Sequence, residues 1–155
     1  MLCLYCGAKN ADLAQSCVSC KRDISTPPDV KGHLGQVISA CEKLQKGIIS
    51  LIEFEEVLRR VDDITQQAKD EISSTPRKDA KAAEFPRRQA LRGLEMFEEA
   101  ISELKLYLQD KDTTHIEYAI PRIREAFKIS VSAHKEFDEL VKAEKKGGST
   151  LDIEA

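Results

Sequence analysis

Residues 3–20 read CLYCGAKNADLAQSCVSC and contain two Cys-x-x-Cys pairs, Cys3 with Cys6 and Cys17 with Cys20. Two residues between thiolates allow a tight turn to direct both sulfurs at one ion. Two such turns supply the four tetrahedral positions that structural zinc prefers. The spacing therefore predicts a site that holds one Zn²⁺ ion per chain through these four cysteines.

Other uses of the four cysteines fit the spacing less well. A secreted disulfide framework usually spreads its cysteines through the fold, whereas the only further cysteine of this chain is Cys41. A thioredoxin-like pair would stand alone beside a βαβ pattern. Iron in the same four-sulfur cage and a redox role for the thiols stay open as alternatives.

The run CLYCGAKNADLAQSCVSCKRDI resembles the short zinc-ribbon module, CxxCG followed by CxxC, that is common near the N-termini of bacterial proteins. The resemblance covers residues 1–25 and implies a small β-hairpin fold with the four cysteines as ligands. The glycine that usually follows the second pair is here Lys21. So short a module buries too little apolar surface to fold alone, and zinc binding, worth about 10–16 kcal/mol in small zinc peptides, would supply most of its folding energy. Its apolar residues could form only a small cluster of Leu4, Leu13, Val18 and Ile24.

The rest of the chain shows the apolar spacing of helices. Residues 26–29 form the expected linker, because its two prolines disfavour a helix. Apolar residues then recur at intervals of three and four, which predicts four helices. Their expected ranges are about 30–45, 51–74, 86–109 and 115–146, followed by a disordered tail over 147–155. Short connections favour antiparallel hairpins, so the predicted fold class is a small β zinc ribbon followed by an all-α antiparallel four-helix bundle over 30–146.

Several local signals refine these helices. Ser50 with Glu53, and Thr114 with Glu117, have the spacing of a capping box. Pro121 lies where the fourth helix should be continuous, which predicts a kink or a restart. The fourth apolar stripe is expected in the bundle core and consists of Ile116, Ile120, Ile123, Phe127, Val131, His134, Phe137 and Val141.

Composition narrows the class of function. The net charge of -3 gives no general attraction for nucleic acid or for an anionic membrane. The longest apolar run, around 48–52, is too short for a membrane helix. The start of the chain has no charged segment followed by a long apolar one, so no signal peptide is expected. The chain has no Gly-rich phosphate loop and no Ser/His/Asp set. These features predict a cytoplasmic protein that is not an enzyme.

A basic segment over 77–92 is the main candidate for partner binding outside the cysteines. Positive charge near a helix start opposes the helix dipole, and a solvated helix face is the simplest explanation. The functional alternative is a docking patch for an acidic protein surface or a phosphate backbone. The basic residues of this segment are Arg77, Lys78, Lys81, Arg87, Arg88 and Arg92.

The sequence favours a non-enzymatic, zinc-binding adaptor or regulatory protein that acts on a protein partner of unknown identity. One alternative is a nucleic-acid-associated factor that uses the ribbon and the basic segment. Another is a thiol redox or zinc-level switch. Self-association also stays open, because amphipathic helical hairpins can complete a bundle between two chains.

Overall fold

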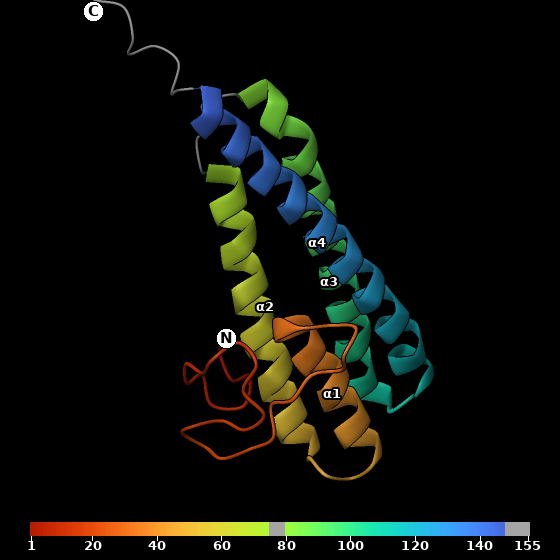
Figure 1. Cartoon of the computed structure of the whole chain (residues 1–155). Helices are drawn as coiled ribbons and strands as arrows, with labels where there is room; N and C mark the ends of the chain where they lie inside the picture. Colours follow the sequence, from red (N-terminus) through yellow and green to blue (C-terminus); the bar gives the residue numbers. More distant parts are fainter. Residues whose placement is uncertain (75–79, 148–155) are drawn as a thin grey trace, which may run out of the picture.

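The structure is a computed structural model that describes residues 1–74 and 80–147. These residues contain four helices, α1 (Gly32–Gln45), α2 (Leu51–Ser74), α3 (Ala80–Asp110) and α4 (Thr114–Gly147). Figure 1 shows α3 and α4 as a long hairpin, with α2 beside it and the short α1 along the lower part of the molecule. Each helix runs in the opposite direction to the one before it. No described helix is long and apolar enough to cross a membrane.

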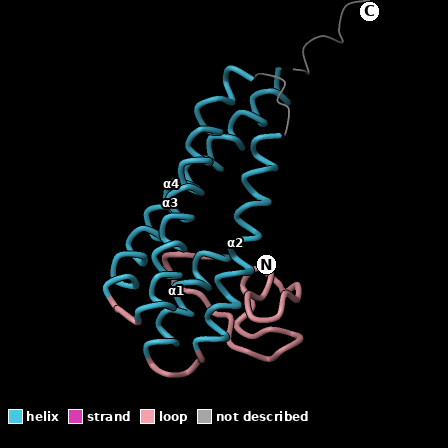
Figure 2. Tube along the Cα trace, turned by 180° about the vertical axis from the view of Figure 1, so that it is seen from behind, coloured by secondary structure: helices cyan, strands magenta, loops and turns pink. Residues whose placement is uncertain are grey.

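The predicted β zinc ribbon is wrong, and with it the fold class of a β ribbon followed by a four-helix bundle. No part of 1–74 or 80–147 forms a β-strand, and the segment before α1 is a series of loops and turns (Figure 2). Its β-pairing within these ranges consists of two isolated bridges, Leu2 with Lys9 and Ser16 with Asp23. Each bridge encloses one Cys-x-x-Cys pair. Inside each bridge the carbonyl of the first cysteine accepts the N–H four residues on, so the chain turns there instead of continuing as a pair of strands.

The helical body also differs from a regular four-helix bundle, because its helices are unequal in length. α1 has 14 residues, whereas α3 has 31 and α4 has 34. α1 therefore lies beside only part of the α3–α4 hairpin (Figure 1). The stripe of α4 expected in the core is consequently exposed in its second half, where Val131 is 51% and the His134 side chain 79% exposed.

α3 begins at Ala80 rather than near residue 86, so the expected polar connection is largely helical. Alanine-rich sequence before Pro86 favours the helix, and Ala83 is buried. Together these two effects outweigh the cost of the helical hydrogen bond that Pro86 cannot donate. α4 likewise continues through Pro121 as one helix. The tail was expected over 147–155, but Gly147 is the last residue of α4. Residues 75–79 and 148–155 lie outside the described residues.

The main core joins all four helices. α1 contributes Val37 and Ile38, and Cys41 is fully buried in the same cluster. α3 and α4 approach closely at Gly93, where a Cβ atom would lie 2.8 Å from Ser130 Oγ. The larger buried side chains of the other three helices are Phe54, Leu58, Phe97, Ile101, Leu104, Ile116 and Ile123.

The capping box at the start of α2 is confirmed. Glu53 N–H donates to Ser50 Oγ at 3.2 Å, and Ser50 N–H donates to Glu53 Oε2 at 2.7 Å. The second expected box is wrong, because Thr114 is already the first residue of α4. Asp112 caps this helix instead, accepting hydrogen bonds from the Thr114 N–H at 3.0 Å and the Thr114 hydroxyl at 2.8 Å.

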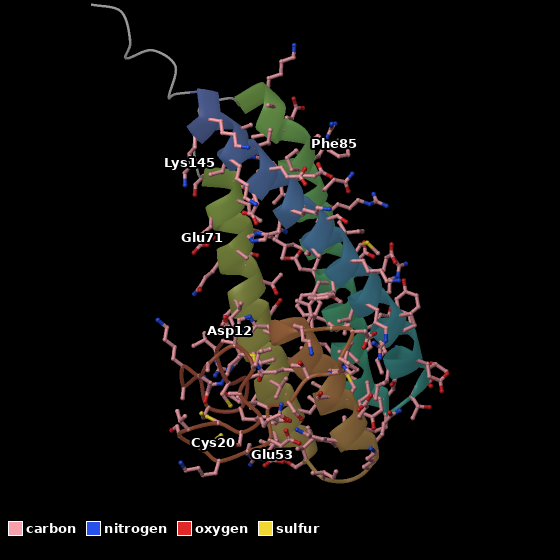
Figure 3. All side chains as sticks on the ribbon, viewed as in Figure 1. Asp12, Cys20, Glu53, Glu71, Phe85 and Lys145 are labelled. Carbon is pink, nitrogen blue, oxygen red and sulfur yellow. The ribbon has the colours of Figure 1, made fainter. Side chains whose placement is uncertain are left out.

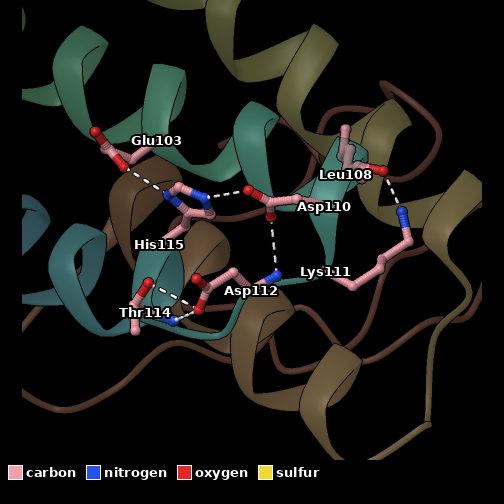
Figure 4. Close-up of polar contacts among 7 residues, drawn as sticks. All are labelled: Glu103, Leu108, Asp110, Lys111, Asp112, Thr114 and His115. Atoms are coloured by element: carbon pink, nitrogen blue, oxygen red, sulfur yellow. Dashed lines mark hydrogen bonds and ion pairs between the residues drawn. The ribbon is translucent and has the colours of Figure 1, made fainter.

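The turn between α3 and α4 is held by His115 (Figure 4). Its Nε2 atom lies 2.8 Å from Asp110 Oδ2, and its Nδ1 atom lies 2.8 Å from Glu103 Oε2. Hydrogen bonds to Asp110 and then to Glu103 raise the pKa of His115 above its ordinary value. His115 thus joins the last turns of α3 to the first turn of α4, and both carboxylates favour its protonated form.

Candidate metal centre

The four cysteines of the two Cys-x-x-Cys pairs come together in the structure. Their Sγ atoms all lie within 4.8 Å of one another. The Cys3 and Cys20 sulfurs are 3.8 Å apart, and those of Cys6 and Cys17 are 3.6 Å apart. A tetrahedron with metal–sulfur bonds of about 2.3 Å has sulfur–sulfur edges of about 3.8 Å. A disulfide would bring two sulfurs to about 2.05 Å, so the spacing matches a metal site and not a disulfide pair.

Two copies of one backbone turn present these sulfurs. We call residues 2–9 the first knuckle and residues 16–23 the second knuckle. In each, the N–H of the first cysteine bonds the carbonyl five residues later, from Cys3 to Ala8 and from Cys17 to Arg22, both at 2.9 Å. In each, that cysteine's carbonyl also accepts an N–H bond four residues on, from Gly7 at 2.8 Å and from Lys21 at 3.0 Å.

Both knuckles need a residue of positive φ at the same position. Gly7 has a φ of 80°, and Lys21 has a φ of 63° at the equivalent place. Gly7 also lies against α2, where a Cβ atom would be 2.5 Å from Arg60 Nη1. Lys21 occupies the strained conformation with its Nζ atom donating to Val18 O at 2.7 Å. The departure from the usual glycine therefore leaves the second turn intact.

The environment differs among the thiols. Burial raises the pKa of Cys3 to about 12. The backbone N–H of Cys20 is the largest influence that lowers the pKa of Cys17 to about 6, and the Ser19 N–H, 3.4 Å from the Cys17 sulfur, acts in the same direction. A bound divalent cation favours the thiolate form of every ligand. Four sulfur ligands also complete a tetrahedral shell, which is the closed arrangement of structural zinc sites.

The first knuckle is packed into the helical body. Leu4, between the two cysteines of that knuckle, is 1% exposed and belongs to the main core. The buried side chain of Gln36 in α1 accepts the Leu4 N–H at 3.1 Å and donates to Leu2 O at 2.7 Å. His33 Nε2 accepts the Leu2 N–H at 3.2 Å. Sequence reasoning gave no role to Gln36 or His33, because no pattern marks a helix residue that bonds a distant backbone.

Charged residues add further contacts between the N-terminal cysteine-containing residues and the helices. Arg22 forms an ion pair with Glu53, the capping residue of α2. Lys43 Nζ donates to Asp23 O at 2.6 Å. The Tyr5 ring lies 5.1 Å from the Arg22 guanidinium and 5.7 Å from the Lys43 ammonium. Burial raises the pKa of Tyr5 to about 12. Residues 1–25, which contain the four cysteines and which we call the cysteine segment, therefore contact both α1 and α2.

The expected small apolar cluster within the cysteine segment is wrong in its membership. Ile24 is buried with Cys3 and Cys17, but Leu4 belongs to the main core instead. Leu13 and Val18 are 76% and 64% exposed. The buried members of this cluster are thus two of the four cysteines and one apolar residue, with Cys6 and Cys20 packed against them.

The basic segment lies on α3, apart from the cysteines. Lys81, Arg88 and Arg92 are exposed and recur at intervals that place them on one face of the helix. Phe85, 51% exposed, lies on the same face, at the opposite end of the molecule from Cys20 (Figure 3). Arg87 is half-buried on another face. Arg77 and Lys78 lie outside the described residues.

The comparisons with known proteins add no family to this description. No family model, no curated protein and no solved structure matches the chain. The resemblance to a zinc ribbon therefore rests on the cysteine spacing and on the clustered sulfurs.

Proposed function

We propose that the four cysteines hold one structural Zn²⁺ ion, and that this ion fixes residues 1–25 in the shape that docks on α1 and α2. The observation that supports this most directly is the pair of 3.6 and 3.8 Å sulfur–sulfur distances. Zinc accepts four thiolates in tetrahedral geometry and uses no open position in such sites. The bound metal would supply the folding energy of a segment that has few apolar contacts of its own.

Metal analysis of the purified full chain tests this proposal. We expect one zinc ion per chain in the wild type, loss of zinc in Cys6→Ser, and retention in Cys41→Ala, whose cysteine lies outside the cluster. Chelation should lower the melting temperature of the helices, because the docked segment contributes Leu4 to their core. Purified protein with reduced thiols and no metal, or with iron and its visible absorption, would contradict the proposal.

On this basis the protein is a non-enzymatic adaptor or regulatory protein that acts through protein contacts. A closed metal site leaves no position for substrate, so activity would reside in the surfaces that the metal-ordered segment and the helices present. Reduced thiolate ligands suit the cytoplasm, where disulfides rarely persist. Release of zinc by mild oxidants would instead favour a thiol redox or zinc-level switch.

The basic face of α3 supports a second candidate, binding to nucleic acid. Lys81, Arg88 and Arg92 surround Phe85, and single-strand binding combines positive charge with aromatic stacking. Arg88→Glu together with Arg92→Glu should abolish binding of a single-stranded oligonucleotide, whose affinity should also fall steeply with salt. Fluorescence anisotropy with the wild type at low salt measures this; absence of binding would remove the candidate.

A further inference from the structure

The two knuckles are alike in backbone and opposite in environment, which indicates a docking surface. Their turn hydrogen bonds correspond one to one, and each is closed by an antiparallel bridge. Leu4 and Val18 therefore occupy equivalent positions, each directly after the first cysteine of its pair. Leu4 is 1% exposed against α1, whereas Val18 is 64% exposed.

From this we propose that the second knuckle docks, through Val18, on an amphipathic helix of a partner protein that carries a carboxylate beside its apolar stripe. The proposal deepens the proposed function and rests on it, since it requires the metal-ordered segment. The first knuckle supplies the precedent for the partner, because the same turn already packs its apolar residue against a helix. That helix, α1, offers apolar side chains and one amide, Gln36, to the backbone of the knuckle.

The backbone N–H and C=O of Val18 already have hydrogen-bond partners, which lowers the cost of burying this residue. Asn10 Oδ1 accepts the Val18 N–H at 2.8 Å, so this side chain does for Val18 what Gln36 does for Leu4. The Val18 carbonyl accepts from Lys21 Nζ at 2.7 Å. Unsatisfied backbone groups are the main cost of burying a turn. A partner thus needs to supply no hydrogen-bonding group for the backbone of Val18.

The charge next to Val18 selects the kind of helix. Lys21 places its ammonium at the Val18 carbonyl. Among the described residues, the ion pairs of the second knuckle join Arg22 to Glu53 and Asp23 to Lys43. Lys21 is therefore the cation beside Val18 for which the described residues provide no carboxylate. A partner carboxylate at this position would complete the contact.

Site-specific photo-crosslinking tests the proposal on the full chain. A benzophenone amino acid replaces Val18, or Phe85 as an exposed aromatic control at the opposite end of the molecule, in cells of the source organism. We expect a discrete product from position 18, mapped by mass spectrometry to an amphipathic helix with Asp or Glu beside its apolar stripe. A synthetic peptide of that helix should bind the zinc-loaded wild type. Val18→Asp should weaken this binding about tenfold or more, while Val131→Asp, at a valine of α4 that is 51% exposed, should leave it unchanged.

Lys21→Gln tests the contribution of charge. It should weaken peptide binding by a smaller factor than Val18→Asp does, and this factor should shrink as salt is added. Zinc content of each variant is measured first, so that loss of the fold is recognised separately. With one zinc per chain, several results would overturn the inference: no product beyond that from position 85, a product on nucleic acid or on a non-helical or basic segment, or unchanged binding by Val18→Asp. A wild type without zinc would overturn both this inference and the proposed function.

Discussion

Truncation of Leu4 should destabilise the whole helical body, although this residue lies between two of the clustered cysteines. Leu4 is 1% exposed and packs in the core shared by α1, α2, α3 and α4. Replacing a buried leucine by alanine costs about 2–5 kcal/mol, because apolar burial is lost and a cavity is left. At about 2–4 °C per kcal/mol for a chain of this size, Leu4→Ala should lower the melting temperature by about 4–20 °C. Circular dichroism of the helical signal measures this, with the protein kept zinc-loaded.

Val18→Ala is the matched control, since it removes apolar atoms from the equivalent position of the second knuckle. Its side chain is mostly exposed, so its effect should stay within about 0.5 kcal/mol. Zinc content should be the same in both variants, because neither changes a ligand. A cost below about 1 kcal/mol for Leu4→Ala, or an equal cost for the two variants, would refute the packing of the first knuckle into the helical core.

Three further outcomes follow from the contacts described above. Gln36→Ala leaves two buried backbone groups of the first knuckle without partners and should cost about 1–3 kcal/mol for each; urea denaturation measures this, with exposed Gln45→Ala expected to be near neutral. His115 has a raised pKa, so the stability it adds is fully present below its ordinary pKa of 6.5 and is lost as pH rises through the raised value. The gap in melting temperature between wild type and His115→Gln should therefore narrow with increasing pH; a constant gap would contradict the ion-pair explanation. Gly7→Ala combines positive φ with a clash on α2 and should destabilise more than Gly47→Ala, which has a φ of 71° and nothing within 4 Å of the new Cβ atom; equal costs by thermal denaturation would show that the clash is relieved.

The helices and the cysteine cluster could be predicted because each depends on local pattern. Apolar spacing identified the four helices, and the Ser50–Glu53 box marked the start of α2 through contacts three residues apart. The two Cys-x-x-Cys pairs predicted the sulfur cluster, because two short turns suffice to gather four thiols. These interactions span few residues, so the sequence contains most of the information that determines them.

The β ribbon failed locally: it was expected from resemblance, but the two bridges do not extend into strands. The failures at Leu4 and His134 concern contacts between distant parts of the chain. Burial of Leu4 depends on helices that come much later in the chain, and its spacing alone cannot distinguish it from Val18. The exposure of His134 reflects the short length of α1, which no pattern within α4 can reveal. Position on a stripe predicts which face a residue occupies, but not whether another element covers that face.

The sulfur cluster forms within one short segment, whereas Leu4 packs against helices that follow it in the chain. This difference suggests an order in which the two parts fold. All four sulfurs belong to residues 3–20, so the metal site can close as soon as that segment is free in solution, with little loop entropy to overcome. Leu4 belongs to a core cluster whose other members run from Val30 to Ala126. A metal held by these sulfurs would therefore order its segment during synthesis before the helices of that core have been made. Zinc supply would then act at the beginning of folding, and docking of the first knuckle would be among its last steps.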